Sequence, residues 1–108
     1  ELKWQSEALE TTPVSGTVQC TWKDQGSGQQ AGKLYLKLMA PDGTETASFE
    51  LAEGVAPHDW EDIDIGLVAT DAVLAQATAG CWYQLEINGG AGGGMELHVE
   101  NFVLGLSG

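Results

Sequence analysis

The chain has 108 residues, 43% of them hydrophobic, which is enough for one folded domain with a core of its own. Sixteen acidic residues against four lysines give a net charge of −12, which repels phosphate groups and argues against binding to nucleic acid or to anionic lipid. No apolar run approaches the roughly 20 residues that a membrane-spanning helix requires, so we expect no insertion into a membrane.

The N-terminal half of the chain contains four segments that are typical of β-strands. Residues 1–9 carry apolar side chains at scattered positions, and we expect an edge strand there. Residues 15–23 (SGTVQCTWK) and 33–39 (KLYLKLM) alternate apolar with polar side chains, which is the period of a strand with one buried face. The turn sequence PDGT at 41–44 leads into a fourth segment, residues 45–51 (ETASFEL). The sequence therefore predicts a hairpin around this turn.

Three further segments in the C-terminal half show the same alternation. They cover residues 60–66 (WEDIDIG), 81–88 (CWYQLEIN) and 95–106 (MELHVENFVLGL). In the last segment, the apolar side chains that follow Asn101 stay on the inward face only if a β-bulge adds one residue there. We therefore predict three strands, the last of them with a bulge near Asn101.

Residues 70–79 (TDAVLAQATA) lack this alternation and are rich in alanine. Thr70 suits the N-cap of a helix, Asp71 suits its first turn, and Gly80 suits its end. We therefore predict one short helix near residues 70–79.

Seven short strands with turn signals between them predict an all-β protein, an antiparallel β-sandwich that occupies residues 1–108 as a single domain. The immunoglobulin signature is absent, because Trp22 follows Cys20 by only two residues and Ala79 stands where that signature has a tyrosine. A jelly-roll sandwich better accommodates the connection that contains the helix. In overall pattern, the chain resembles the galactose-binding-domain-like β-sandwiches, which are compact jelly rolls found as carbohydrate- and protein-binding appendages. The resemblance covers most of the chain, is architectural, and assigns no site residue.

The two cysteines, Cys20 and Cys81, both fall on strand faces that we assign to the core. They would form either one disulfide between two strands, as in secreted β domains, or two buried free thiols that pack as small hydrophobic side chains. The sequence leaves both alternatives open. Neither cysteine lies in a CxxC pair, and their spacing from the histidines indicates no zinc site.

Three glycine-rich segments lie between predicted strands, and they are the main clue to function. They are residues 24–32 (DQGSGQQAG), 53–60 (EGVAPHDW) and 88–94 (NGGAGGG). They fall at every second connection, and in an antiparallel arrangement alternate connections emerge at the same end of the sheet. We therefore expect the three segments to gather at one end, which we call the loop end. Loops held by rigid strands are where binding groups concentrate.

Residues 88–94 resemble a phosphate-binding loop only superficially, because they lack its lysine and no long helix follows them. A nucleotide site is therefore not expected. We predict that this segment is a hairpin connection between two strands.

The loop end would carry carboxylate, amide and indole groups, which together are common in sugar-binding sites. Polar side chains exchange hydrogen bonds with sugar hydroxyl groups, and the face of an aromatic ring packs on the C–H surface of the sugar ring. The same residue types also suit ordinary turns, so a purely structural role is the alternative. The candidate ligand-binding residues are Asp24, Gln25, His58, Asp59, Trp60, Asn88 and Glu96.

No arrangement of residues in the sequence points to catalysis. His58 and Asp59 form a pair without a third member to act as nucleophile. The simpler interpretation is that His58 hydrogen-bonds within its own loop and that Trp60 anchors this loop to the core. We therefore expect no enzyme activity and no catalytic residue.

Two sets of residues are candidates for holding a metal ion. Glu96, His98 and Glu100 share one face of a strand and would suit Zn²⁺ or Mn²⁺, although such a row is more often a solvated surface. Calcium is the better-supported ion, because aspartates near loop ends offer hard oxygen ligands. No other cofactor is expected. The aspartates are Asp24, Asp59, Asp62 and Asp64.

The sequence thus predicts a non-catalytic binding module that recognises a carbohydrate or another neutral ligand through its glycine-rich loops. Its partner would be a carbohydrate or a protein, and not a nucleic acid. The alternative is a structural or protein-interaction domain of a larger assembly, with no small-molecule ligand.

Overall fold

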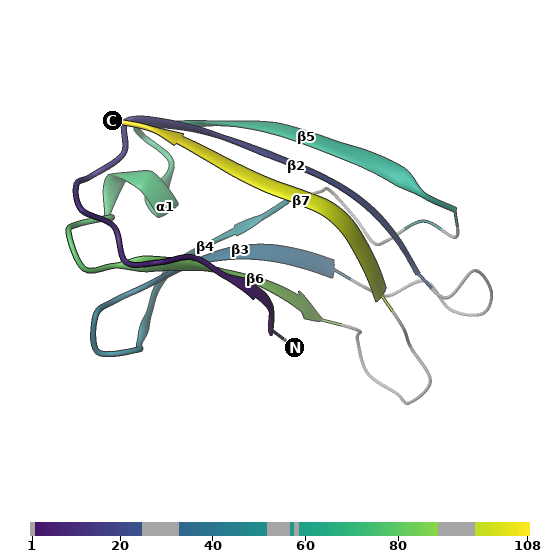
Figure 1. The fold of residues 1–108 in the computed structure, drawn as a ribbon, viewed down its shortest axis with the longest axis horizontal. Coiled ribbons are helices and arrows are strands. Elements are labelled where there is room, and N and C mark those ends of the chain that lie inside the picture. The colour runs from purple at the N-terminus through teal and green to yellow at the C-terminus, as the bar shows by residue number, and fades with distance from the viewer. Residues whose placement is uncertain (1, 25–32, 52–56, 58, 89–96) are drawn as a thin grey trace.

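The computed structural model describes residues 2–24, 33–51, 57, 59–88 and 97–108 (Figure 1). Seven strands and one short helix make up this part of the chain, which confirms the predicted all-β class. The elements are β1 (Leu2–Gln5), β2 (Ser15–Asp24), β3 (Lys33–Met39), β4 (Glu45–Glu50), β5 (Glu61–Val68), α1 (Ala72–Ala75), β6 (Trp82–Asn88) and β7 (Leu97–Ser107).

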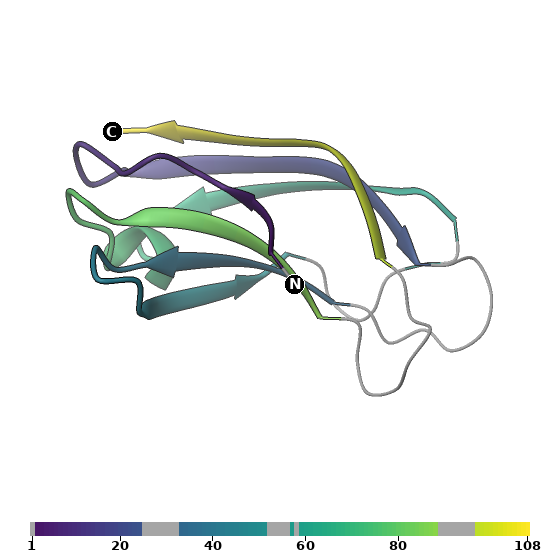
Figure 2. The same cartoon turned by 60° about the horizontal axis from the view of Figure 1, so that its bottom comes forward.

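The strands form two antiparallel sheets that pack face to face (Figures 1 and 2). One sheet has four strands in the order β1-β6-β3-β4, and the other has three strands in the order β5-β2-β7. Consecutive strands therefore alternate between the two sheets except at the β3–β4 hairpin, and this alternation is jelly-roll-like. The prediction of a hairpin between the last two strands is wrong, because β6 and β7 belong to different sheets.

The core lies between the two sheets and is built by the inward faces of the strands. Along β3, half-buried and buried residues alternate at each step, so Leu34, Leu36 and Leu38 point inward as their spacing predicted. From the other sheet, β2 contributes Cys20 and Trp22, which are almost fully buried. Each large apolar side chain that is buried in this way stabilises the fold by roughly 1.5–3 kcal/mol. The packing of one apolar sheet face on another is what a two-layer sandwich requires.

A β-bulge near Asn101 keeps the apolar residues of β7 on the inward face, as the sequence predicted. The register between β2 and β7 shifts at Cys20, which two residues of β7 oppose. Asn101 has a φ of 57°, in the left-handed region that asparagine tolerates better than most residues. Because of this extra residue, Phe102 and Leu104 pack against the core.

Helix α1 is a single turn and is shorter than the predicted helix over residues 70–79. Its N-cap is Asp71 and not Thr70. The carboxylate of Asp71 accepts a 2.8 Å hydrogen bond from the main-chain N–H of Val68 and makes none to the helix itself. Gly80 lies several residues beyond the helix, where it takes a φ of 94° in the turn before β6. A helix of one turn has little stability of its own, so tertiary packing sets its length.

The N-terminal segment closes one side of the sandwich. β1 pairs with β6 at the edge of the four-stranded sheet, which confirms the predicted edge strand. Trp4 packs across to Phe102 of the other sheet, and their ring centroids are 4.8 Å apart. The hydroxyl of Ser6 accepts a 2.8 Å hydrogen bond from the main-chain N–H of Tyr83. The Trp4–Phe102 contact joins the first strand to the last although the two belong to different sheets, and the other two contacts hold the N-terminal segment on β6.

Candidate functional site

The strand ends that flank the three glycine-rich segments lie together at one end of the sandwich (Figures 1 and 2). In the three-stranded sheet, the end of β2 at Asp24 pairs with the start of β7 at Leu97. In the four-stranded sheet, the start of β3 at Lys33 pairs with the end of β6 at Asn88. β5 begins at Glu61, beside the same end of β2. The segments between these ends fall largely outside the described residues, which exclude 25–32, 52–56, 58 and 89–96.

The structure describes only part of the predicted ligand-binding set. Asp59 and Trp60 are described, and both are exposed. Asp24 and Asn88 are the last residues of β2 and β6, so their main chains lie at the loop end. A single binding site made by the whole set therefore stays a prediction. The remaining three residues, Gln25, His58 and Glu96, lie outside the described residues.

Trp60 forms an aromatic and cationic cluster with two side chains that the sequence did not assign to this site. The Nζ atom of Lys23 lies 5.0 Å from the centroid of the Trp60 ring, which is the range of a cation–π contact. The ring of His98 is tilted by 56° to the indole, with 6.4 Å between the centroids. Trp60 keeps 44% of its surface exposed, so the interpretation that it anchors its loop to the core is wrong.

The cluster stands on two rigid strands. Lys23 and His98 are directly paired across β2 and β7. Their neighbours Trp22 and Val99 pack into the core, so the alternation of a strand directs Lys23 and His98 to the outer face. The alternation of β2 in the sequence already indicates that Lys23 points outward. Its position beside Trp60 could not be predicted, because that requires knowing which strands pair with β2.

The outer face of the three-stranded sheet continues from this cluster toward the other end of the sandwich. Residues that are directly opposite each other in an antiparallel register lie on the same face of the sheet. Three further rows of side chains follow from the loop end onward. They are Asp62, Thr21 and Glu100, then Asp64, Gln19 and Val103, then Gly66, Thr17 and Gly105.

A shallow depression of about 420 Å³ lies on this outer face, over the first two of these rows. The carboxylates of Asp62 and Asp64 and the amide of Gln19 are exposed, and none of them has a hydrogen-bond or ion-pair partner among the described residues. These groups are therefore available to a ligand. The depression is lined chiefly by Gln19, Thr21, Asp62, Asp64, Asn101 and Val103.

The described residues contain no group of three or more His, Cys, Asp or Glu side chains that could hold a metal ion. Of the predicted zinc or manganese row, His98 and Glu100 lie on the outer face of β7, and Glu96 is outside the described residues. Asp62 and Asp64 line the depression without gathering further ligands. Neither metal prediction gains support from this part of the chain.

The two thiols are free and buried, which decides between the alternatives that the sequence left open. Burial raises the pKa of Cys20 to about 11, so its thiol stays protonated at neutral pH and is a poor nucleophile. The Sγ atom of Cys81 lies 3.4 Å from the hydroxyl of Thr78. Both cysteines therefore serve the core as small hydrophobic side chains.

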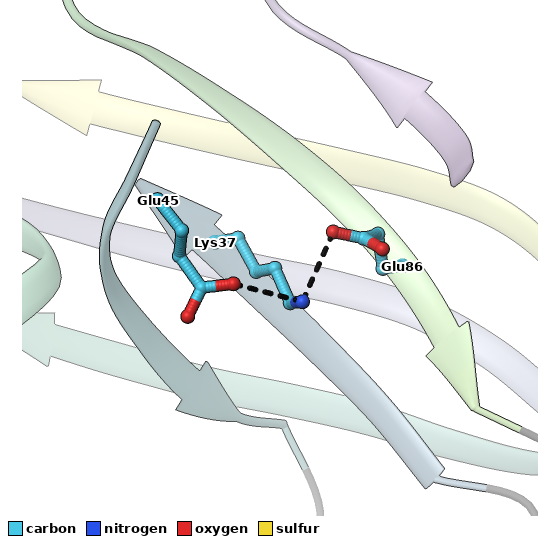
Figure 3. Close-up of polar contacts among 3 residues, drawn as sticks. All are labelled: Lys37, Glu45 and Glu86. Atoms are coloured by element: carbon cyan, nitrogen blue, oxygen red, sulfur yellow. Dashed lines mark ion pairs between the residues drawn. The ribbon is translucent and has the colours of Figure 1, made fainter. Parts of the chain in front are cut away.

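A second hollow, of about 280 Å³, lies on the outer face of the four-stranded sheet around Lys37. The Nζ atom of Lys37 lies 2.9 Å from Oε1 of Glu45 and 3.2 Å from Oε2 of Glu86, so one cation joins β4, β3 and β6 (Figure 3). The hydrogen bond to Glu45 is the main cause that raises the pKa of Lys37 above its usual value. Because Lys37 is already paired with two carboxylates, this hollow is less suited to a ligand than the depression on the other sheet.

None of the helical structure in the described residues has the length and apolar character that a membrane crossing requires. The chain matches no protein-family model. No curated protein matches it either. A proposal of function therefore rests on the chemistry of the exposed faces themselves.

Proposed function

We propose that this chain is a non-catalytic binding module that holds a carbohydrate or another neutral ligand at the loop end of the sandwich. The observation that carries the proposal is the half-exposed indole of Trp60, which stands beside Lys23 and His98 on the outer face. An exposed aromatic ring with polar groups around it is a common arrangement for binding a sugar, because the ring packs on C–H groups while the polar groups bind hydroxyls.

The contacts that Trp60 makes support this proposal in addition to its exposure. Side chains of β2 and β7 contact the ring and limit its motion, so less conformational entropy would be lost when a ligand packs on it. Asp59 is exposed directly before it and adds a carboxylate that accepts hydrogen bonds from hydroxyl groups. The net charge of −12 disfavours anionic ligands and is compatible with a neutral one.

A glycan microarray, read with and without calcium, tests the proposal. We expect the whole chain to bind a subset of neutral glycans, and Trp60→Ala to weaken that binding by about tenfold or more, the loss of a stacked ring and its fixed geometry. Tyr35→Ala is the matched control, because Tyr35 is an outward aromatic side chain on the other sheet and should leave binding unchanged. Binding that persists in Trp60→Ala, or the absence of any glycan signal, would contradict the proposal.

A second candidate function is a protein-interaction domain, which a different feature favours. At the end of the three-stranded sheet that is opposite to Trp60, Val14 and Val68 are 55% and 57% exposed and flank the same residue of β2, Ser15. Large aliphatic side chains left exposed near one sheet end can contribute to a contact with another protein. Val68→Lys should then abolish a complex seen by size-exclusion chromatography or pull-down, while leaving glycan binding intact.

A further inference from the structure

We infer that the ligand is a neutral oligosaccharide that lies along the outer face of the three-stranded sheet, from Trp60 to the depression around Gln19 and Asp64. This inference rests on the proposed function and adds the length, charge and path of the ligand. It uses Trp60 and side chains of β2, β5 and β7, all of which the structure describes.

Trp60 and Asp64 mark the two ends of the path. Asp64 lies four residues beyond Trp60, which directly precedes β5, and extended chain rises by about 3.4 Å per residue, so the two positions are separated by roughly 14 Å. Both lie on the outer face: Asp64 pairs with the outward residue Gln19, and the ring of Trp60 contacts the outward residues Lys23 and His98. A single sugar ring does not cover this span, whereas a short oligosaccharide does.

The depression has the chemistry that a hydroxyl-rich chain requires. It is an open depression of about 420 Å³, so a chain lying in it would keep one side in solvent. The amides of Gln19 and Asn101 both donate and accept hydrogen bonds, while Asp62 and Asp64 accept them from hydroxyl groups. Val103 is 56% exposed and offers an apolar surface to the C–H groups of a sugar ring.

The charges on this face disfavour an anionic ligand. An anionic glycan would meet the carboxylates of Asp62 and Asp64 in the depression, and Glu100 in the adjacent strand. Lys23, whose Nζ atom lies 5.0 Å from the centroid of the Trp60 ring, repels a cationic group at that position alone. A neutral chain meets repulsion at neither end of the path.

Beyond the depression, the next row of the outer face carries only small side chains. A Cβ atom added to Gly66 would meet no atom within 4 Å, and the side chain of Thr17 is the nearest neighbour of one added to Gly105, at 3.0 Å. These two glycines flank Thr17 in the next row, so no large side chain of that row obstructs a ligand that continues past Asp64. The path is therefore open for longer oligosaccharides.

Isothermal titration calorimetry of the whole chain with neutral glycans of increasing length tests this inference. The probes are oligomers of β-linked glucose, mannose, xylose and N-acetylglucosamine, each from the monosaccharide to the hexasaccharide. For the series that binds, we expect the affinity to rise up to at least the trisaccharide. Gln19→Ala and Asp64→Ala should each weaken hexasaccharide binding by about three- to tenfold, the size of a lost hydrogen bond, and leave monosaccharide binding unchanged.

Gln84→Ala is the matched control, because Gln84 is a glutamine on the outer face of the other sheet and should not change any affinity. Melting temperatures equal to that of the unmodified chain would show that the exposed substitutions leave the fold intact. An affinity that does not depend on length, with no effect of Gln19→Ala and Asp64→Ala but a loss in Trp60→Ala, would overturn the inference and keep the proposed function. A uronic-acid oligomer that binds as tightly as the neutral one would also overturn it. Binding of a lysine-rich peptide and of no glycan would overturn both.

Discussion

The hydroxyl group of Tyr83 donates a 2.6 Å hydrogen bond to the main-chain carbonyl of Val73, and both residues are fully buried. This contact joins β6 to α1, the only helix in the described part of the chain. Since a helix of one turn has little stability of its own, its place over the core depends on this bond and on the burial of Val73 and Leu74.

Removal of this hydroxyl should therefore destabilise the fold. We expect Tyr83→Phe to lower the free energy of unfolding by about 1–3 kcal/mol, because it leaves a buried carbonyl without its partner. Chemical denaturation measures the change. Tyr35→Phe, on the outer face of β3, is the control and should stay within about 0.5 kcal/mol of the unmodified chain. Equal midpoints for the two variants would show that the bond contributes nothing.

Alkaline pH should weaken the fold through two buried acids. Burial raises the pKa of Cys20 from 9.0 to about 11, and burial raises the pKa of Tyr83 from 10.0 to about 12. The folded state thus holds these protons more tightly than the unfolded chain, so their stabilising effect is complete below about pH 9 and is lost between pH 9 and 12.

The melting temperature, followed by circular dichroism, should accordingly fall across this pH range. Cys20→Ala should remove the part of the fall that begins near pH 9, and Tyr83→Phe the part that begins near pH 10. If the melting temperature of both variants falls with pH as steeply as that of the unmodified chain, these two groups are not the cause.

Local patterns in the sequence were sufficient to predict the strands. The alternation of Leu34, Leu36 and Leu38 with polar residues predicted both the strand and its buried face. The bulge was predictable for the same reason, because the apolar period on either side of Asn101 fits only with one extra residue. The period of a strand is a property of consecutive residues, and no distant contact is needed to recognise it.

The assignment of strands to sheets was not accessible in this way. The segment that follows Asn88 has the composition of a hairpin turn, yet the strands on its two sides belong to different sheets. The pairing of Lys23 with His98 beside Trp60 likewise joins positions far apart in the sequence. Such contacts depend on the order of strands in each sheet, which alternation alone does not specify.

The β3–β4 turn offers a test of backbone strain. Gly43 has a φ of 91°, whereas Gly66 in β5 has no positive φ, and a Cβ atom added to either meets no atom within 4 Å. Gly43→Ala should therefore cost about 1–2 kcal/mol through strain alone, and Gly66→Ala should be close to neutral. Denaturation midpoints measure both. Equal effects would mean that the difference in φ has no energetic consequence.

The Lys37 ion pairs should contribute little, because they are partly exposed. The side chains of Lys37, Glu45 and Glu86 keep 25%, 46% and 26% of their surface exposed. We expect Lys37→Gln to lower the free energy of unfolding by about 0.5–1 kcal/mol at low salt and by less at high salt, where the charges are screened. Lys33→Gln, which among the described residues breaks one 3.3 Å pair with Glu50, is the control and should have a smaller effect. A larger loss at high salt than at low salt would contradict this account.

Trp22 and Trp60 should differ sharply in what they contribute to stability. Trp22 is 1% exposed, and its indole N–H is buried without a hydrogen-bond partner among the described residues. Trp22→Ala should cost about 3–5 kcal/mol by opening a cavity, and Trp22→Phe should cost less, because it fills part of the space and removes an unsatisfied donor. Trp60→Ala, at an exposed position, should change stability by about 0.5 kcal/mol or less.

The same denaturation series therefore separates a structural tryptophan from one that is free to bind a ligand. If Trp60→Ala were as destabilising as Trp22→Ala, the indole would be part of the core, and its loss of binding would say nothing about a site. If Trp60→Ala keeps the stability of the unmodified chain and loses the glycan, the ring itself contacts the ligand.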